Sequence, residues 1–342
     1  MSKVSVLEHN QQFSLECGST LPKLEIAYTT HGALSANKDN VVWVFHALTA
    51  NANPLEWWPG LIGEDCLLTP NKYFIVCANM LGSCYGTTGP DSIDPATGKK
   101  YGMDFPLITI RDMVRTHELL RAALGIDNIY LGIGGSMGGQ QLLEWNVINP
   151  FLFKNSCLIA TNMRHSAWGI AFNSAQRLAM EADPTLHTKN DGAGRKGLKA
   201  ARAIAMLSYR NAHIYRKKQT DTEDKIDGFK ADSYQNYQGE KLCNRFSPHA
   251  YWYLTKAMDS HNVGRNRKAI RKELKQVKSK ALVIGIKTDL LFSYIEQKII
   301  ANCFKDGRFK LIESLYGHDG FLIETNKIKY LLKDFLTGAS SI

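Results

Sequence analysis

The sequence predicts an α/β protein whose central sheet is mainly parallel, is flanked by helices, and is interrupted by a mostly helical insertion. Three observations support this fold class. Short apolar runs rich in β-branched residues recur along the chain, helical patterns lie between several of them, and this alternation stops at about residue 183 and resumes after about residue 278. Alternating strands and helices indicate a parallel sheet that is covered on both faces.

Six segments are predicted to be buried strands because their apolarity is continuous rather than alternating. They are VVWVFHA (41–47), YFIVCAN (73–79), NIYLGIG (128–134), NSCLIAT (155–161), ALVIGI (281–286) and FKLIES (309–314). The segment TIRDMVRTHELLRAALG (109–125) predicts a helix, since its apolar residues fall on one stripe. Thr109 is its candidate N-cap and Gly125 its candidate C-terminal stop.

Residues 183–278 lack the strand signal. They contain helical patterns, including GLKAARAIAMLSYR and SPHAYWYLTKAMDSH, together with a polar stretch, RKKQTDTEDKIDGFKADSYQNYQ. Because strand-like sequence resumes afterwards, we expect an insertion within one α/β core and not a separate domain. The predicted organisation is therefore a discontinuous core of residues 1–182 and 279–342, with 183–278 as a helical insertion.

The composition is that of a globular protein, with 342 residues, 44% hydrophobic and 22% charged. The formal net charge is +10, but the segment GRNRKAIRKELKQVKSK (264–280) has eight Lys or Arg against one Glu and so carries +7 of it. We interpret this segment as a solvated helix face, with attraction of an anionic cofactor as the alternative. Nucleic-acid binding is not expected, because aromatic interleaving and a recognisable binding motif are absent.

Metal, disulfide and membrane chemistry are not supported by the sequence. The seven cysteines are scattered without a C-x-x-C pair, so we expect mostly reduced core residues, and the ten histidines show no H-x-x-x-H spacing. No bound metal or cofactor is therefore expected. No apolar run approaches the roughly 18 residues needed to span a bilayer, and the N-terminal segment lacks the apolar core of a signal peptide. We expect no membrane association and a cytoplasmic location.

One serine stands in an unusual setting. The stretch YLGIGGSMGGQQLLEW (130–145) begins as a strand, passes through five glycines around Ser136 and continues as a helix former. Residues 134–138 form G-x-S-x-G between a predicted strand and a predicted helix, which is the pattern of a nucleophile elbow. The alternative is a glycine-rich turn that only binds an anion at the helix N-terminus.

A serine hydroxyl needs a base, and the elbow pattern predicts a carboxylate and then a histidine later in the chain. Asp289 follows the strand ALVIGI, 153 residues after Ser136, and His318 follows the next strand, 29 residues later. We predict that Ser136 attacks, His318 moves the proton, and Asp289 holds the imidazole. Spacing alone leaves Asp259 and Asp319 as rival carboxylates, although Asp319, adjacent to the histidine, is better placed to face a substrate.

Backbone donors are predicted for the oxyanion that would form at Ser136. Met137 N–H is one by elbow geometry, and the other is expected from the loop FHALTANAN, where we choose Leu48. His46 in this loop has base chemistry but precedes the serine, so we expect it to make a structural hydrogen bond.

Further segments carry a resemblance over nearly the whole chain: HALTANAN, NMLGSCYGTTGP, YGMDFPLITIRDMV, GGSMGGQQLLEW, SAWGIAFNSAQRLAMEADP, ARAIAMLSYR, YQGEKLCNRF and GHDGFL. Together they resemble the homoserine O-acyltransferases of the α/β-hydrolase fold, chiefly the homoserine O-acetyltransferases. The resemblance implies transfer of acetyl from acetyl-CoA, as co-substrate, to the hydroxyl of L-homoserine through an acyl-serine, in methionine synthesis. It also implies that the insertion is a lid over a tunnel to the serine and forms a homodimer.

By the same resemblance, Arg202 would clamp the homoserine carboxylate, Tyr209 would assist by hydrogen bonding, and Asp319 would hold the amino nitrogen. A guanidinium grips a carboxylate with two parallel hydrogen bonds, and an aspartate pairs with an ammonium, so the chemistry agrees. Two residues depart from the expected pattern: Ser247 and Asn262 stand where aspartates are expected. Both fall in the predicted lid.

Rival functions remain open at this point. The same triad would make a serine esterase or thioesterase if water replaced homoserine, and the lid is the feature that would exclude water. Within the family, succinyl-CoA as donor and L-serine as acceptor are known variations, and we favour acetyl. A binding protein without catalysis is disfavoured by the presence of Ser136, Asp289 and His318.

Overall fold

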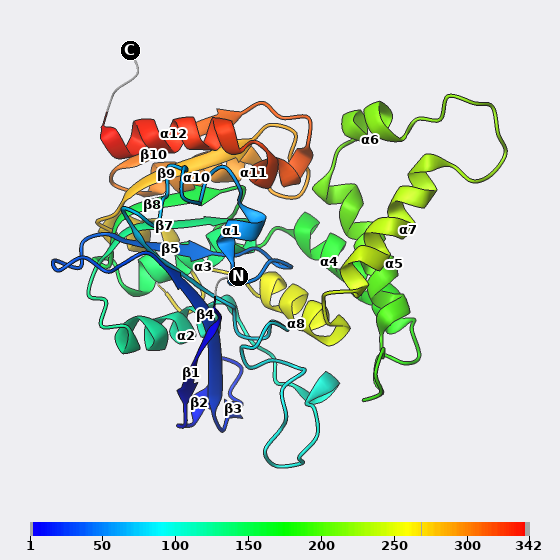
Figure 1. The fold of residues 1–342 in the computed structure, drawn as a ribbon, viewed down its shortest axis with the longest axis horizontal. Helices are drawn as coiled ribbons and strands as arrows, with labels where there is room; N and C mark the ends of the chain where they lie inside the picture. Colours follow the sequence, from blue (N-terminus) through cyan, green and yellow to red (C-terminus); the bar gives the residue numbers. More distant parts are fainter. Residues whose placement is uncertain (1–2, 268, 339–342) are drawn as a thin grey trace.

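Eight strands form one sheet in the computed structural model, which describes residues 3–267 and 269–338 (Figure 1). In spatial order they are β1 (Ser5–His9), β4 (Leu24–His31), β6 (Phe74–Ala78), β5 (Val41–Phe45), β7 (Ile129–Gly135), β8 (Phe153–Ile159), β9 (Lys280–Ile286) and β10 (Gly307–Ile312). The six strands from β6 to β10 in this order run parallel, and β4 and β1 add an antiparallel edge. A separate hairpin pairs β2 (Phe13–Ser14) with β3 (Thr20–Leu21).

The α/β fold class and all six predicted strands are confirmed. β5 is buried along its whole length, and β7, β8 and β9 are buried at all but one position each, which is why their sequences read as continuous apolar runs. The edge strand β1 alternates between half-buried and exposed residues and carries a weaker apolar signal. The sequence interpretation therefore found the parallel part of the sheet and missed its antiparallel edge.

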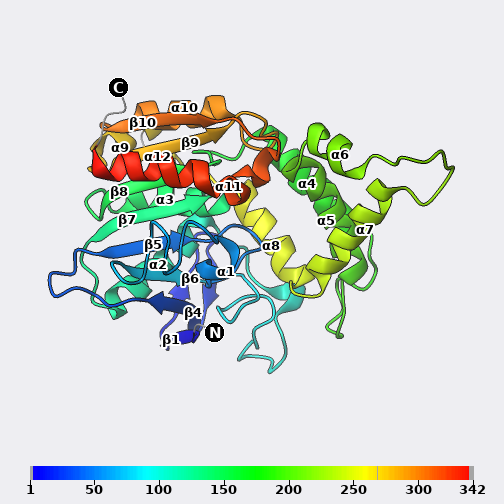
Figure 2. The same ribbon diagram turned by 45° about the horizontal axis from the view of Figure 1, so that its top comes forward.

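Helices cover both faces of the sheet (Figure 2). On one face, the side chains of Trp43 and Phe45 pack with apolar residues of α2 (Ile110–Ala123), α3 (Met137–Ile148), α9 (Ile270–Gln276) and α10 (Tyr294–Cys303). On the other face, Val42 and Val44 meet α1 (Pro54–Trp57), α11 (Gly320–Ile323) and α12 (Thr325–Thr337). Two short 3₁₀ helices, η1 (Gly102–Asp104) and η2 (Gly317–Asp319), lie in the connecting loops.

The predicted ends of α2 are confirmed. The Thr109 side chain accepts a hydrogen bond from the Asp112 N–H while the Asp112 carboxylate accepts one from the Thr109 N–H, which forms a capping box. Gly125 follows the C-cap with φ of +63°, a left-handed conformation that glycine adopts without a steric penalty.

A helical layer stands beside the sheet and its flanking helices (Figures 1 and 2). It contains α4 (Ala167–Glu181), α5 (Arg195–Tyr209), α6 (Ala212–Gln219), α7 (Lys230–Cys243) and α8 (Pro248–Asp259), with α8 lying between the sheet and the other helices. In the described part of 183–278 there are five helices and no strand. Helix α4, which precedes residue 183, packs on α5 and α8, whereas α9 packs against the sheet side through Leu274. The division at 183 and 278 stays a prediction.

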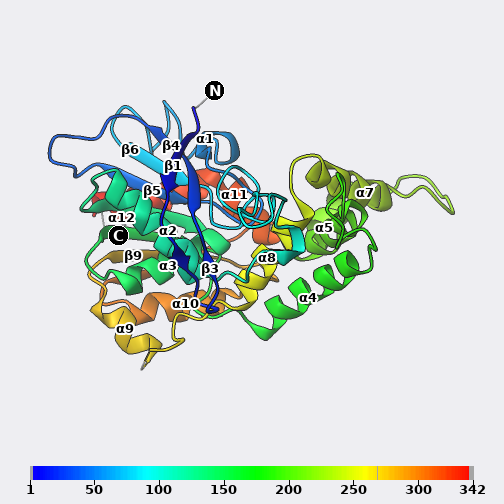
Figure 3. The same ribbon diagram turned by 90° about the horizontal axis from the view of Figure 1, so that it is seen from below.

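An ion-pair network joins the N-terminal segment, α2 and α3 to the segment that follows α8. Arg111 of α2 lies 2.7 Å from both Glu16 and Glu144, Arg265 lies 2.7 Å from Glu16, and Arg267 lies 2.7 Å from Glu144. Two cations of the basic segment 264–280 are thus used in structure rather than presented to a ligand. Lys268 of that segment lies outside the described residues. The rest of the segment includes α9, which lies far from α5 and α7 (Figure 3).

Glu144→Gln is expected to lower the free energy of unfolding by about 3 kcal/mol, because it leaves two partly buried guanidinium groups without their shared carboxylate. The Glu144 side chain is only 2% exposed, so water cannot replace the lost charge. Urea unfolding followed by circular dichroism measures the change. Glu313→Gln is the control, since its pair with Lys287 is exposed, and its unfolding midpoint should match the wild type. Equal midpoints for all three proteins would contradict the prediction.

Candidate active site

Ser136 occupies the turn between β7 and α3 in a strained conformation. Its φ is +56° and its ψ is −126°, a region that non-glycine residues rarely occupy. Its N–H donates to the Ile159 carbonyl at 2.9 Å, and the Thr161 hydroxyl donates to the Ser136 carbonyl at 2.9 Å. These contacts with β8 and the residues after it hold the turn in place.

The glycines around Ser136 let the strand and the helix approach closely. A Cβ on Gly134 would lie 2.6 Å from the backbone of Gly138, and a Cβ on Gly138 would lie 2.2 Å from the Phe45 carbonyl oxygen. Either contact is too short for real atoms, so both positions require glycine. The structure thus has the strand–turn–helix context that the G-x-S-x-G pattern needs.

His318 stands between the serine and an aspartate. Its Nε2 lies 2.9 Å from Ser136 Oγ, and its Nδ1 lies 2.7 Å from Asp289 Oδ2. The other carboxylate oxygen of Asp289 accepts hydrogen bonds from the N–H groups of Leu291 and Phe292 at 2.8 and 2.9 Å. With Asp289 fixed in this way, the imidazole can keep its Nδ1 proton toward the carboxylate and take a proton from the serine at Nε2.

The two rival carboxylates are engaged elsewhere. Asp259, on α8, accepts hydrogen bonds from Asn173 at 2.8 Å and from Arg177 of α4. Asp319 pairs with Arg210 at 3.0 Å. The serine, aspartate and histidine predicted from the sequence are therefore the three side chains that the structure brings together.

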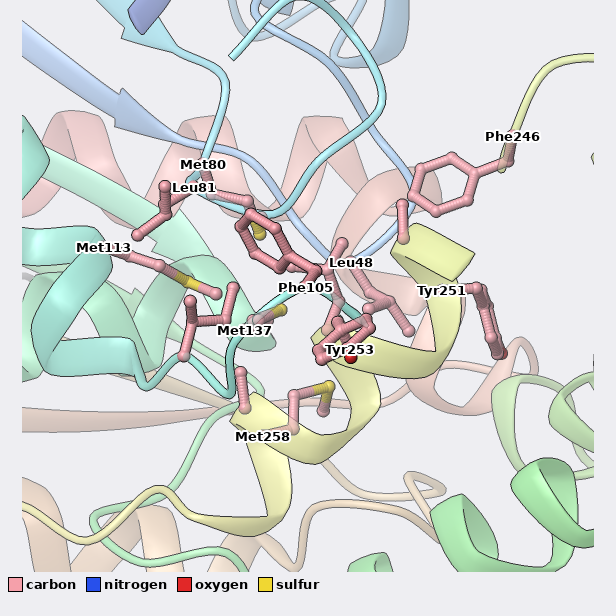
Figure 4. Close-up of a cluster of buried hydrophobic side chains, with 14 of the residues drawn as sticks. Leu48, Met80, Leu81, Phe105, Met113, Met137, Phe246, Tyr251, Tyr253 and Met258 are labelled. Atoms are coloured by element: carbon pink, nitrogen blue, oxygen red, sulfur yellow. The ribbon is translucent and has the colours of Figure 1, made fainter. Parts of the chain in front are cut away.

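The loop after β5 forms a turn beside the serine. The turn's own hydrogen bond runs from the Ala50 N–H to the Ala47 carbonyl at 3.0 Å and does not use the N–H of Leu48. Met137 is the first residue of α3, where backbone N–H groups have no acceptor within the helix. Leu48 and Met137 belong to one buried cluster together with Met80, Phe105 and Tyr251 (Figure 4). The N–H groups of Leu48 and Met137 stay the predicted oxyanion donors.

His46 holds that loop through two hydrogen bonds. Its Nδ1 lies 2.9 Å from the Ala47 carbonyl, and its Nε2 accepts from the Met80 N–H at 3.1 Å. Burial lowers the pKa of His46 to about 4, so the ring is neutral. The structural role expected for His46 agrees with these bonds.

The three residues assigned to substrate by resemblance also gather beside His318. The Tyr209 ring lies 5.8 Å from the His318 ring, and the Arg202 guanidinium lies 5.2 Å from the centre of the Tyr209 ring. Within the described chain, Arg202 Nε is buried without a hydrogen-bond partner. Burial raises the pKa of Asp319, while the nearby charges of Arg210 and Arg202 act to lower it. A guanidinium with an unused donor thus lies close to a carboxylate and a phenol.

Arg210 is a member of this group that sequence reasoning missed. It directly follows Tyr209 at the end of α5, but its pairing with Asp319, 109 residues later, has no sequence signal. The close approach is visible at Gly317, whose φ is +62° and where a Cβ would lie 2.9 Å from the backbone of Arg210. The end of α5 therefore rests directly on the loop that carries His318.

The two departures from the expected pattern have structural roles. Ser247 caps α8 by accepting from the Ala250 N–H, and its hydroxyl donates to Asp91 at 3.0 Å. A carboxylate, that of Asp91, thus lies within hydrogen-bond distance of the Ser247 side chain. Asn262 accepts from the Gly264 N–H at 2.9 Å and shapes the turn that leaves α8.

Metal-ligating residues do not cluster in the described ranges, where no group of three or more His, Cys, Asp or Glu could hold an ion. Four of the seven cysteines are buried, and Cys17 is exposed. Among the helices of the same ranges, none is long and apolar enough to cross a bilayer.

Comparison with known proteins agrees with the fold. A family model described as "alpha/beta hydrolase fold" matches residues 40–325, so the chain is a protein of the α/β-hydrolase fold. The homoserine O-acetyltransferase of Cyclobacterium marinum is 50% identical over 325 residues, which cover 95% of this chain and 93% of that protein. That of Chlorobium chlorochromatii is 42% identical, covering 96% and 93%. The chain belongs to the homoserine O-acetyltransferase family.

Solved structures give the same fold. The homoserine O-acetyltransferase of Staphylococcus aureus has a TM-score of 0.83 at 28% identity, with 100% of this chain and 97% of that chain covered. Esterase E22 has a TM-score of 0.89 at 20% identity, with 98% and 100% covered, which shows a shared fold alone. An esterase and a transferase thus share this architecture.

Buried neutral histidines make stability depend on pH. Burial lowers the pKa of His46, His117 and His165 to about 4 and that of His261 to about 3, against 6.5 for a free imidazole. Between pH 6.5 and 4 these four histidines are mostly protonated in the unfolded chain and mostly neutral in the native state. The free energy of unfolding should therefore fall with decreasing pH, by up to about 5 kcal/mol per pH unit near pH 5.

Urea unfolding at several pH values measures this slope. His117→Gln should reduce it by about one proton's contribution, or about 1.4 kcal/mol per pH unit. His187→Gln is the matched control, because His187 is exposed and its removal should leave the slope unchanged. An unfolding free energy that stays constant from pH 7 to 5 would show that these histidines are protonated in the native state.

Proposed function

We propose that this protein transfers the acetyl group of acetyl-CoA to the hydroxyl of L-homoserine by way of an acetyl-serine at Ser136. The single observation that carries the proposal is the position of the Ser136–His318–Asp289 triad next to Arg202, Tyr209 and Asp319. A nucleophile for an acyl group and a set of charges suited to an amino acid lie in one place. The identity with homoserine O-acetyltransferases along nearly the whole chain supports the same activity.

In the first half-reaction, Ser136 Oγ attacks the thioester carbonyl while His318 Nε2 takes its proton. The carbonyl oxygen becomes an oxyanion that the N–H groups of Leu48 and Met137 stabilise. The C–S bond then breaks, and the proton on His318 goes to the departing thiolate. Asp289 stabilises the imidazolium during this exchange and keeps the ring in the required tautomer.

In the second half-reaction, the homoserine hydroxyl takes the place of the thiol. His318 removes the hydroxyl proton, the oxygen attacks the acetyl-serine, and the proton returns to Ser136 Oγ as the ester leaves. Arg202 would hold the substrate carboxylate through its unpartnered donor, with Tyr209 beside it. Asp319 would hold the ammonium group while keeping its contact with Arg210.

Hydrolysis is the second candidate, because the esterase E22 shares the fold. Two features favour transfer. Ser136 is only 5% exposed, and α5 packs on η2, the short helix that contains His318, so little of the serine is open to water. Arg202, Tyr209 and Asp319 would have no group to bind in a simple acetate ester, whereas an amino acid can use the two charges and the phenol.

We also propose a homodimer assembled through the helical layer, in the cytoplasm. The layer has large apolar side chains that are exposed in the single chain: Trp168 and Leu178 of α4, Leu207 of α5 and Tyr237 of α7. A second copy that covered them would remove this surface from water and fix the layer in place.

The activity is tested by incubating the protein with acetyl-CoA or succinyl-CoA, with and without L-homoserine or L-serine. Thiol release and acylated amino acid are followed together, the latter by mass. We expect thiol release that depends on homoserine and yields O-acetylhomoserine, and at least about a 1,000-fold loss in Ser136→Ala. Ser233→Ala, an exposed serine on α7, is the control. Acetate as the main product would make the protein a hydrolase, and activity with succinyl-CoA alone would change the donor.

Arg202→Ala is expected to raise the KM for homoserine by about 100-fold, because a charge-assisted pair with the substrate carboxylate is lost. Arg202→Lys should recover part of this loss, since the charge returns without the paired donors. Hydrolysis of a neutral acetyl ester should fall far less. Arg216→Ala, an exposed arginine on α6, should behave as the wild type. An unchanged homoserine KM in Arg202→Ala would remove Arg202 from the substrate site.

A further inference from the structure

A pocket of about 540 Å³ lies between the loop that follows β6 and the helical layer. One wall comes from the 84–102 loop, with Cys84 and Lys100. The other wall comes from residues 189–198 and 243–249, and its floor includes the buried side chains of Leu198 and Phe246. The pocket lining thus combines buried apolar side chains with charged ones.

Positive charge gathers on the walls of this pocket from both layers. Lys100, Lys189, Arg195 and Arg245 line it, against the carboxylates of Asp91 and Asp191. Lys189 pairs with Asp104, but that contact is exposed and exchanges readily with water or a ligand. The cations come from segments up to 145 residues apart in sequence, from Lys100 to Arg245, so no single run of the sequence indicates the pocket.

Two helices begin at the same pocket and add to this charge. Helix α5 begins at Arg195 and has 15 residues, and α8 begins at Pro248 and has 12 residues. Both Arg195 and Pro248 are among the lining residues. The N-terminal ends of helices carry partial positive charge, so both dipoles favour an anion in the space between them.

The pocket is connected to the catalytic loop by Arg245. Its Nη1 donates to the Thr49 carbonyl and to the Tyr85 hydroxyl, the latter at 2.9 Å. Thr49 is adjacent to Leu48, the proposed oxyanion donor. Phe246 at the pocket floor belongs to the same buried cluster as Leu48 and Met137 (Figure 4). Arg245 and Phe246 therefore connect the pocket to the loop and to the buried cluster that contain Leu48.

We propose that this pocket binds the phosphorylated nucleotide of the CoA thioester, a proposal that rests on the acyl-CoA donor of the proposed function. The phosphates pair with Lys100, Lys189 and Arg245, and the uncharged thioester arm runs past Phe246 toward Leu48. Of the two substrates in the proposed reaction, only the CoA thioester has several negatively charged phosphates, and a long arm separates them from the thioester. A basic pocket beside the catalytic loop suits such a ligand. Binding there holds the core loop and the helical layer together.

Calorimetric titration of CoA into the resting protein tests the pocket without catalysis. The double variant Lys100→Glu with Lys189→Glu should raise the Kd by at least about fivefold, because two attractive charges become repulsive. Asp191→Asn should lower the Kd, since it removes a negative charge from the same wall. Lys298→Glu on α10 makes one such charge reversal at an exposed position outside the pocket and should leave the Kd unchanged. Added salt should weaken binding to the wild type more than to the double variant.

Kinetics with two donors separate this proposal from the proposed function. The double variant should lose at least about fivefold more kcat/KM with acetyl-CoA than with S-acetyl-N-acetylcysteamine, which has a thioester but no nucleotide. Equal losses of kcat/KM with both donors, or an unchanged Kd for CoA in a double variant that folds like the wild type, would overturn the proposal that CoA binds in this pocket. If the wild type binds CoA here but forms no O-acetylhomoserine, the proposed function fails and the pocket stands.

Discussion

The site depends on one strained residue. Ser136 is held at positive φ between β7 and α3, a conformation that costs on the order of 1–3 kcal/mol for a non-glycine residue. The sheet offsets this cost, because the Ser136 N–H bonds to Ile159, and Gly138 packs against the Phe45 carbonyl at a distance that excludes any Cβ. The strands β5, β7 and β8 thus act together to present one hydroxyl. A change that loosened this packing would release the strain and turn the hydroxyl away from His318.

The helical layer is part of the site and not only its cover. The loop with His318 meets the end of α5 at Gly317, and Arg210 of that helix pairs with Asp319. Arg202 and Tyr209 come from the same helix. The proposed acyl machinery therefore lies in the core, while most of the proposed homoserine contacts lie on α5. The packing of α5 on residues 317–319 sets the distance between them.

Much of this could be predicted from the sequence because the signals are local. The buried parallel strands are continuous apolar runs, the ends of α2 have a capping box and a glycine, and Ser136 lies in a five-residue pattern that requires its neighbours to be small. Strand β1 was missed because it is an edge strand whose residues alternate between half-buried and exposed. Arg210 and the pocket around Lys100 were missed for a different reason. Their partners lie far away in sequence, and only the packing of the helical layer on the core brings them together.

The contrast with the esterase neighbour shows what the fold leaves undecided. A serine, a histidine and an aspartate in this geometry make an acyl-enzyme from any activated ester, so the next step is decided by which nucleophile reaches the carbonyl first. Water is present at about 55 M and competes with the acceptor for the acyl carbon. The acceptor reacts faster only if the site excludes water and orients the acceptor hydroxyl near that carbon. The effective molarity of the bound hydroxyl measures this advantage. The unpartnered donor of Arg202 and the carboxylate of Asp319 suit that purpose, because they can fix both charged ends of an amino acid and leave its hydroxyl free to face His318. Under the proposed function, specificity for transfer resides in the charges that α5 brings to the histidine loop, and the triad supplies the reactivity that both classes share.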